Sequence, residues 1–242
     1  MWIADRVEKL VPYLRRYARA ATGESALGDG CVEIVLQTVL TQSLEVGFDA
    51  DRFDKERLYT LLDQELAKIQ KDPNARARRA LLLIAVEGFA DAVASRILGV
   101  PKEALPEMLA IAEKDFAEST ATRMLIIEDE PLISAQLKRL TEGLGHKVIG
   151  VASTAADAVA LNLEHKADII LCDIMLADGS LGTDAIAAME LSSSIPVVYI
   201  TAYPEKYLST SNEGPSYLIT KPFSQDYLKA VIGHALLNVQ SE

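Results

Sequence analysis

Two patterns of apolar and polar residues meet near residue 120. In the first half, apolar residues recur at every third or fourth position, which is the period of an α-helix packed on one side. In the second half, short apolar runs alternate with helical patterns, which is typical of a parallel β-sheet covered by helices. The pattern therefore predicts an all-α domain over 1–120 and an α/β domain over 121–242.

The first half contains six expected helices. Gly23 and Gly47 are expected to close the first two, and Asp54 is expected to cap the third. The fourth is apolar on nearly every side, so it belongs at the centre of its domain. The apolar residues that define the six run from Val7 to Tyr17, Val32 to Leu40, Leu58 to Ile69, Ala80 to Val86, Val93 to Leu98 and Leu105 to Phe116.

Strand and helix signals alternate five times in the second half. They predict a flavodoxin-like (βα)5 domain with a parallel sheet in the order 2-1-3-4-5. Ligands of such sheets bind where the strand order reverses, here between strands one and three. Asp129 and Asp173 are therefore expected to face each other. The helices are expected near 131–142, 154–164, 183–192, 205–211 and 224–239.

Composition and charge narrow the class of protein. The 242 residues are 50% hydrophobic and carry a net charge of −11, which disfavours nucleic acid and anionic lipid and suits a basic protein partner. No apolar run approaches the roughly 20 residues of a membrane span, and no secretory signal is evident at the N-terminus. Cys31 and Cys172 offer no disulfide framework, so reduced thiols and a cytoplasmic location are expected.

Polar side chains follow four of the apolar runs. They are Glu128-Asp129-Glu130, then Asp173, Thr201 and Lys221. Clustered carboxylates repel one another unless a cation lies between them, and oxygen ligands suit Mg²⁺. Such an ion neutralises an incoming phosphoryl group and leaves one carboxylate free to attack phosphorus. The hydroxyl and the amine can bind phosphoryl oxygens, so these strand ends form a candidate phosphoryl-acceptor site.

These residues resemble the receiver domain of two-component response regulators. The resemblance is carried by Leu125-Ile-Ile-Glu-Asp-Glu-Pro131, Asp173, Thr201 and Thr220-Lys-Pro-Phe223. It implies that Asp173 accepts a phosphoryl group from a sensor histidine kinase or a phosphotransferase, and that Thr201 and Lys221 contact the phosphate. It further implies a Mg²⁺ site made by Asp129 and Asp173 directly, Glu128 through water, and the backbone carbonyl of Met175.

Two departures from the common receiver pattern are visible. The position three residues before the lysine, usually aromatic, is Leu218, with Tyr217 beside it. The tract Tyr199-Ile-Thr-Ala-Tyr203 resembles a receiver subfamily with an aromatic residue two positions after the threonine, so Thr201 and Tyr203 are the candidate switch residues. The loop Leu176–Gly182 also lacks the usual proline four positions after the acceptor.

The first half resembles small sigma factors. Leu14-Arg-Arg-Tyr-Ala-Arg-Ala-Ala-Thr-Gly23 with Gly28-Asp29 is similar to their region two, placed over about 1–60. Arg79–Phe89 and Ala94–Pro101 are similar to the helix-turn-helix of region four, placed over about 61–118. A DNA-reading last helix needs basic residues, but 101–118 holds two lysines against five acidic residues. The surface therefore has the pattern of a sigma factor without the charge to bind DNA.

A sigma-like domain ahead of a receiver resembles the PhyR family, response regulators of the alphaproteobacterial general stress response. The resemblance implies an anti-anti-sigma factor that, once phosphorylated, mimics sigma, captures the anti-sigma factor NepR and releases the stress sigma factor. Unphosphorylated, the receiver is expected to cover the mimic, with Tyr203, Tyr207 and Tyr217 on the docking face.

Two other functions remain open from the sequence. One is a DNA-binding response regulator with a sigma-derived reader, and the other is a phosphate sink whose helical half is only structural. His146, His165 and His234 are scattered along the chain, so no nucleophile–base pair is expected. The protein is therefore not expected to be an enzyme beyond accepting and losing its phosphoryl group.

Overall fold

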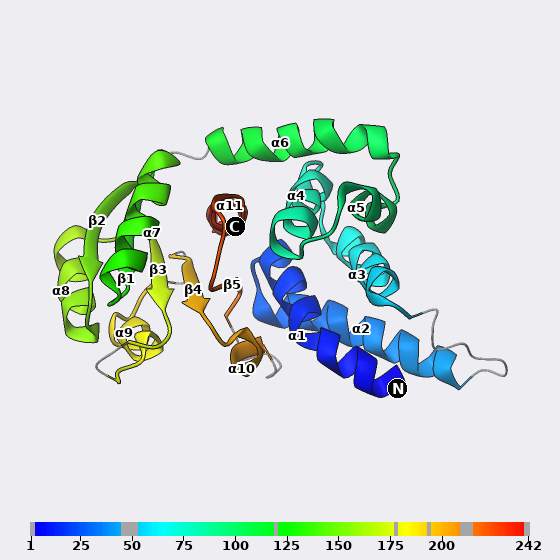
Figure 1. The fold of residues 1–242 in the computed structure, drawn as a ribbon, viewed down its shortest axis with the longest axis horizontal. Coiled ribbons are helices and arrows are strands. Elements are labelled where there is room, and N and C mark those ends of the chain that lie inside the picture. Colours follow the sequence, from blue (N-terminus) through cyan, green and yellow to red (C-terminus); the bar gives the residue numbers. More distant parts are fainter. Residues whose placement is uncertain are drawn as a thin grey trace. The chain divides into compact units, whose positions relative to one another are not determined.

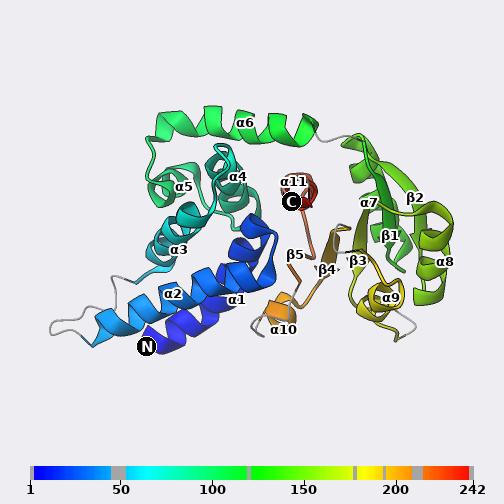
Figure 2. The same cartoon turned by 180° about the vertical axis from the view of Figure 1, so that it is seen from behind.

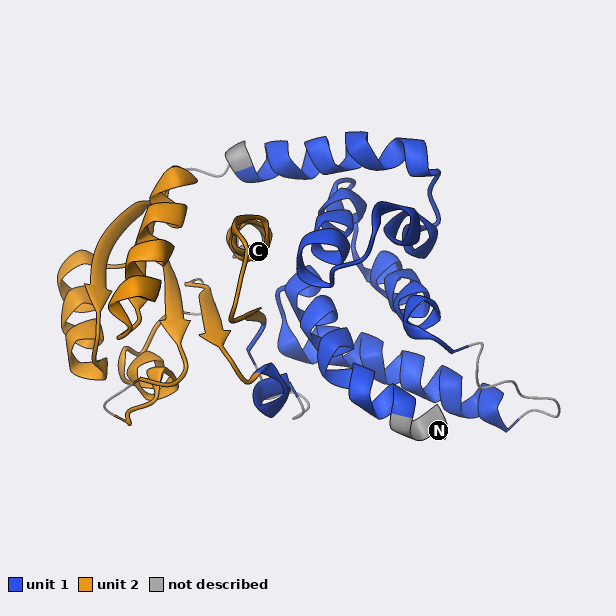
Figure 3. Cartoon of the chain, viewed as in Figure 1, with its two compact units in different colours: residues 1–117, 204–216 blue, residues 118–203, 217–242 orange. Residues whose placement is uncertain are grey.

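The computed structural model describes residues 3–44, 53–118, 121–176, 179–192, 195–208 and 215–239. Its chain forms two compact units, which are coloured separately in Figure 3. A helical unit holds residues 1–117 together with 204–216, and a sheet unit holds residues 118–203 and 217–242. The segment 204–216, which lies between two strands of the sheet in the sequence, thus groups with the helices.

Among the described residues, the helical unit contains six α-helices and two short irregular helices from the first half of the chain, together with α10 (Pro204–Leu208) (Figure 1). Asp54 caps α3 as expected, since its side chain accepts a hydrogen bond from the Arg57 N–H. Gly23 ends α1 with a φ of 80°, a left-handed conformation that favours glycine. The N-terminal elements are α1 (Ile3–Thr22), α2 (Ser25–Ser43), α3 (Lys55–Ile69), α4 (Ala75–Leu81), the π-helix η2 (Leu82–Val86), α5 (Asp91–Leu98), the 3-10 helix η3 (Lys102–Ala104) and α6 (Leu105–Glu118).

Helices α1 and α2 approach each other closely at Gly28. A Cβ on Gly28 would lie 2.6 Å from the backbone nitrogen of Arg19 and 2.8 Å from the carbonyl carbon of Ala18. Because backbone atoms cannot move aside as a flexible side chain can, only glycine permits this contact. The Gly28-Asp29 pair noted in the sequence therefore has a packing role.

The sheet unit has five parallel strands in the order β2-β1-β3-β4-β5, which confirms the predicted topology (Figures 1 and 2). Helices α8 and α9 cover one face through Ala158 and Ala185, while α7 and α11 pack on the other. The elements are β1 (Arg123–Ile127), α7 (Pro131–Gly143), β2 (Lys147–Ala152), α8 (Ala155–His165), β3 (Ile169–Asp173), α9 (Gly182–Ala188), β4 (Val197–Thr201), α10 (Pro204–Leu208), β5 (Tyr217–Thr220) and α11 (Gln225–Val239).

Several element boundaries differ from the sequence prediction. The helix expected over 183–192 ends at Ala188, because Met189 forms its C-cap and Glu190 has a φ of 46°, which a helix cannot continue through. The last helix of the first half begins after a 3-10 turn rather than directly at Pro101. The predicted stop at Gly47 and the end of the helix expected over 205–211 lie outside the described residues.

Both cysteines are buried and unpaired, Cys31 in α2 and Cys172 in β3. The prediction that Cys172 lies in a buried strand is thereby confirmed. Among the helices that the structure describes, none combines the length and the apolar character needed to span a bilayer.

Candidate functional site

Three acidic side chains meet at the carboxyl ends of β1 and β3. Ligand oxygens of Glu128, Asp129 and Asp173 all lie within 4.8 Å of one another. Parallel pairing sets Ile127 beside Cys172, so the next residue of each segment, Glu128 and Asp173, reaches the same edge of the sheet. Glu128 and Asp173 are buried, whereas Asp129 is half-buried and accessible from solvent. The sequence-predicted cluster is therefore assembled.

Lys221 joins this cluster from the end of β5. Its Nζ donates to Asp173 Oδ2 at 2.7 Å and lies 2.8 Å from Glu128 Oε2 and 3.7 Å from Glu130 Oε1. Burial alone lowers the pKa of Lys221, but the hydrogen bonds and charges of Asp173 and Glu128 outweigh it and raise the pKa. The amine therefore stays charged. The peptide bond between Lys221 and Pro222 is cis.

The other carboxylate oxygen of Asp173, Oδ1, faces a backbone N–H group. Asp173 Oδ1 accepts a hydrogen bond from the Met175 N–H at 3.1 Å, so both carboxylate oxygens are oriented. Burial raises the pKa of Glu128, with the charge of Asp173 adding to it and Lys221 opposing it. Two buried carboxylates with one lysine leave excess negative charge, which a divalent cation would neutralise. Oxygen donors in this number fit Mg²⁺.

Thr201 and Tyr203 follow β4 beside this site. Ile200 is in register with Asp173, so Thr201 lies one residue beyond the level of Asp173 on the neighbouring strand. Its hydroxyl is buried and accepts a hydrogen bond from the Tyr203 N–H at 3.1 Å. The Tyr203 side chain is 62% exposed. The two candidate switch residues are thus coupled through the backbone just ahead of α10.

The loop after Asp173 contains a functional position that sequence reasoning missed. Met175 and Leu181 form an isolated antiparallel bridge, and the Gly182 N–H donates to the Ile174 carbonyl. A Cβ on Gly182 would lie 2.0 Å from the carbonyl oxygen of Asp173. Glycine at this position permits the close approach of Gly182 to the backbone of Asp173. The signal in the sequence was the glycine itself, at the end of a loop that lacks the usual proline.

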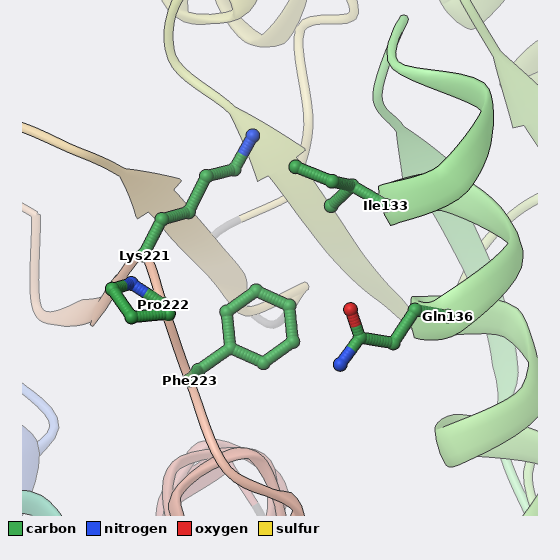
Figure 4. A pocket seen from close by; sticks show the side chains of 5 residues that line it. All are labelled: Ile133, Gln136, Lys221, Pro222 and Phe223. Atoms are coloured by element: carbon green, nitrogen blue, oxygen red, sulfur yellow. The ribbon is translucent and has the colours of Figure 1, made fainter.

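A cavity of about 310 Å³ borders Lys221 in the sheet unit. Figure 4 shows Ile133 and Gln136 projecting from α7 toward Phe223, with Pro222 and Lys221 on the other wall. Its walls are largely apolar, and the Lys221 amine is directed to the carboxylates instead. The cavity therefore supplies apolar contact area next to the acceptor rather than a further charged group.

The docking role expected for Tyr203, Tyr207 and Tyr217 stays a prediction, and the structure describes the contacts of Tyr217. Tyr217 is 4% exposed, and its hydroxyl accepts a hydrogen bond from Asn238 of α11. This hydroxyl therefore contacts the last helix of the sheet unit. Hydrogen bonds between α10 and α1 run instead from Tyr13 to the Glu205 carboxylate at 2.9 Å and from Arg15 to the Leu208 carbonyl at 3.0 Å.

The arginines of the region-two-like motif point inward. Arg16 binds Glu87 and Arg19 binds Asp29, each through two hydrogen bonds, while Arg15 holds the end of α10. Helix α2 (Ser25–Ser43) contains two charged residues along its whole length, and both are acidic. Cations that are used internally cannot neutralise DNA phosphates, which weighs against a DNA-binding function.

Three family models match successive parts of the chain. The sigma2 domain of PhyR matches residues 7–63, the sigma-like domain of response regulator PhyR matches 73–119, and the response regulator receiver domain matches 124–233. The fold and the acidic site, together with these matches, define a response regulator whose receiver follows a sigma-like helical segment.

Similarity to known proteins extends over the whole chain. The phyllosphere-induced regulator PhyR of Methylorubrum extorquens is 40% identical over 258 aligned positions, covering 100% of this chain and 97% of the relative. The crystal structure of PhyR from Brucella abortus has a TM-score of 0.88 and 38% identity, covering 100% and 96% of the two chains. That of the anti-anti-sigma factor PhyR from Bartonella quintana has a TM-score of 0.88 and 36% identity, covering 99% and 98%. The chain belongs to the PhyR family.

Proposed function

We propose that this protein is a phosphorylation-activated anti-anti-sigma factor, which sequesters a NepR-type anti-sigma factor and so releases a stress sigma factor. The observation that carries the proposal is the position of α10 (Pro204–Leu208). This segment begins three residues after Thr201, yet it packs with α1 of the sigma-like unit. A change at the acceptor site can therefore reach the sigma-like surface through a few residues of backbone.

Asp173 is the proposed phosphoryl acceptor. One oxygen of its carboxylate attacks phosphorus, the bond from phosphorus to the donor breaks, and the donor leaves as free histidine of a kinase or phosphotransferase, or as acetate from acetyl phosphate. Lys221, charged and 2.7 Å from Asp173, balances negative charge on the phosphoryl oxygens. Hydrolysis of the acyl phosphate by water restores the carboxylate, so the protein needs no further catalytic group.

Asp129 and Asp173, with Glu128 through water and the carbonyl of Met175, are the proposed Mg²⁺ ligands. When bound, the ion would neutralise charge between the carboxylates and the incoming phosphoryl group. The donor set supports this assignment because it consists of oxygen atoms from buried or half-buried groups with one lysine to offset them.

Thr201 and Tyr203 are the proposed switch residues. When the Thr201 hydroxyl donates to a phosphoryl oxygen it is drawn toward Asp173, and the Tyr203 N–H, which donates to that hydroxyl, is drawn with it. The backbone of Tyr203 then shifts, and Pro204, the first residue of α10, shifts with it. Loss of the hydrogen bonds that Tyr13 and Arg15 make to α10 would free this side of α1.

The partner surface is proposed to include α2. Its side chains Leu27, Ile34 and Leu40 are 42%, 47% and 65% exposed, and the only exposed charge of the helix is Glu33. The last helix, α6, adds the exposed acidic side chains Glu107 and Glu113. An apolar and acidic surface of this kind fits an amphipathic, basic helix, in agreement with an anti-sigma protein rather than DNA.

Energetics sets the size of the switch. Moving the protein from about 1:99 to 99:1 in favour of the capture-competent state requires roughly 5.5 kcal/mol. Two hydrogen bonds to α10, one of them from an arginine, supply part of this amount, at roughly 0.5–3 kcal/mol each. The same proposal places the protein in the cytoplasm, because the sigma factor that it releases acts there on RNA polymerase.

The test is a capture assay on the full chain. NepR from Bartonella quintana, which has been co-crystallised with the PhyR of that species, serves as the immobilised probe. Wild type and Asp173→Ala are compared with and without acetyl phosphate and Mg²⁺. We expect strong capture only of the phosphorylated wild type. Asp157→Ala, at an exposed aspartate of α8, is the matched control and should behave as wild type.

Three outcomes would contradict the proposal. Equal capture of Asp173→Ala and of unphosphorylated wild type would remove the switch. Salt-sensitive binding of the phosphorylated protein to promoter DNA in a gel shift, without capture of NepR, would favour a DNA-binding regulator. Phosphorylation without any partner would indicate a phosphate sink.

A further inference from the structure

A buried charged cluster lies at the centre of the sigma-like unit. Glu87 accepts hydrogen bonds from Arg16 Nε and Nη2, both at 2.9 Å, and from the Tyr59 hydroxyl at 2.6 Å. The side chains of Arg16 and Glu87 are 8% and 1% exposed, and Tyr59 is fully buried. The carboxylate is thus satisfied entirely by protein groups.

This cluster crosses between the two sigma-like segments. Arg16 in α1 and Tyr59 in α3 belong to the segment matched over 7–63, whereas Glu87 belongs to the segment matched over 73–119. Glu87 directly follows η2, a π-helix, and its own N–H donates to the Leu82 carbonyl. Single π-turns occur preferentially at functional positions of helices. The chain therefore departs from regular helix at the residue that closes the cluster.

A second buried pair makes the same crossing. Asp63 of α3 accepts hydrogen bonds from Tyr17 at 2.9 Å and from Arg79 Nε of α4 at 2.6 Å. An exposed pair, Arg96 with Glu56, also joins the two segments, but its side chains are 57% and 32% exposed. Solvent screens such a surface pair, so it contributes little. The chain thus offers a buried cluster and an exposed pair that span the same boundary.

Buried ion pairs are poor sources of stability. Desolvation of the charges offsets much of their attraction, so replacement of the whole set by apolar side chains of similar volume is often neutral or stabilising. A buried ion pair does restrict geometry, because a buried carboxylate that is bound by both nitrogens of an arginine tolerates only one arrangement of the two side chains. A cluster of this kind selects one packing of the two segments over alternative packings of similar hydrophobic content.

We propose that Arg16, Tyr59 and Glu87 are positioning residues for partner capture: they hold α1–α3 and α4–α6 in one packing arrangement, and the anti-sigma partner recognises that arrangement. The inference rests on the proposed function for its partner, but the packing itself is a property of the unit alone. It predicts that stability and capture can be separated by mutation.

The deciding variant replaces all three residues by apolar ones, Arg16→Met with Tyr59→Phe and Glu87→Leu, in the full chain. We expect it to fold with a melting temperature near that of wild type. We expect its phosphorylation by acetyl phosphate to be unchanged, and its capture by Bartonella quintana NepR to be at least about tenfold weaker in Kd, within the range of energies that couple contacting residues. The control Glu56→Gln with Arg96→Gln should lose neither stability nor capture.

A partner-free measurement keeps the two proposals distinguishable. Spin labels on exposed positions of α1 and α5, introduced as Glu8→Cys and Asp91→Cys, report the distance between the segments. Cys31 and Cys172 are buried. We expect one narrow distance distribution in the otherwise wild-type protein and a broadened one in the triple variant. If the triple variant does not fold, Glu87→Gln decides by the same two readouts.

Each outcome of these two measurements overturns a different claim. An equally narrow distribution in the cluster variant overturns the positioning role. A broadened distribution with undiminished capture overturns the claim that the partner reads this arrangement. If wild type itself never captures NepR, the proposed function fails, while the distance measurement still decides whether the cluster sets the packing.

Discussion

Gly182 lies against the backbone of Asp173 so closely that a Cβ on it would come within 2.0 Å of the Asp173 carbonyl oxygen. The same Cβ would lie 2.5 Å from the Cys172 Sγ. Because β3 is buried on both faces, neither atom can retreat without moving the strand. The close approach of Gly182 to Asp173 therefore depends on the absence of a side chain at residue 182.

Gly182→Ala is expected to impair phosphorylation of Asp173. The added methyl group must displace the acceptor strand or the loop, at a cost of roughly 1–3 kcal/mol in the free energy of unfolding. The rate of phosphorylation by acetyl phosphate, measured by mass spectrometry, should fall with it. Gly143→Ala, where the Cβ would meet no atom within 4 Å, should leave that rate unchanged. An unaffected Gly182→Ala protein would show that the loop adapts freely.

Mg²⁺ is expected to stabilise the unphosphorylated protein against thermal unfolding. Binding to the folded state alone contributes about 2.7 kcal/mol when the ion is at 100 times its Kd. Asp129→Asn should abolish the increase in melting temperature, because it removes the accessible carboxylate of the cluster. Asp157→Asn, on α8, should retain it. An equal Mg²⁺ response in the Asp129 and Asp157 variants would argue against the assigned ligands.

Arg15→Gln is expected to raise capture of NepR by the unphosphorylated protein. The guanidinium donates to the Leu208 carbonyl at the end of α10, and a hydrogen bond from a charged group is worth roughly 1.5–3 kcal/mol. Basal capture should therefore rise about tenfold or more. Tyr13→Phe removes a more exposed contact and should have a smaller effect, whereas Lys9→Gln should have none. Unchanged basal capture by the Arg15 variant would show that the contact between α1 and α10 has no part in the switch.

Two glycines of α2 are expected to respond to alanine with opposite signs. Gly28→Ala places a Cβ 2.6 Å from the Arg19 backbone nitrogen and should lower the free energy of unfolding by roughly 1–3 kcal/mol. Gly30→Ala meets no atom within 4 Å and should raise it by roughly 0.5–1 kcal/mol, since alanine favours the helix. Urea unfolding of both variants measures the difference. Equal effects would contradict the close contact of α1 with α2.

Tyr59→Phe is expected to change how the free energy of unfolding depends on pH in the alkaline range. Burial, with the charge of Glu87 adding to it, raises the pKa of Tyr59 well above its usual value near 10. The folded protein therefore keeps this proton where the unfolded chain loses it, so wild type loses stability as pH rises above 10. At pH 8 the phenylalanine variant should be less stable by roughly 1.5–3 kcal/mol. The difference in the free energy of unfolding between wild type and variant should narrow toward pH 11. A constant difference would contradict the raised pKa.

Much of the fold and of the carboxylate cluster was predictable because local sequence patterns determine both. Alternating apolar runs and helical periods predicted the five-stranded parallel order, and the polar residue after each run predicted the cluster of Asp129, Asp173 and Lys221. Parallel strands bring their carboxyl ends to one edge, so four separate strand ends become neighbours by topology alone. Asp54 as a helix cap belongs to the same local kind of signal.

What the sequence determined by itself is the class of each half, the acidic strand ends and the excess of acidic over basic residues in 101–118, since these depend on residues near one another in the chain. The tertiary structure alone decided that Tyr217 is buried, that α10 packs on α1, and that Arg16 and Glu87 meet in a buried cluster. Arg15 and Leu208 are 193 residues apart, and no periodicity encodes a pairing over such a separation. Those contacts follow from how whole helices pack, and they are the contacts on which the proposed switch depends.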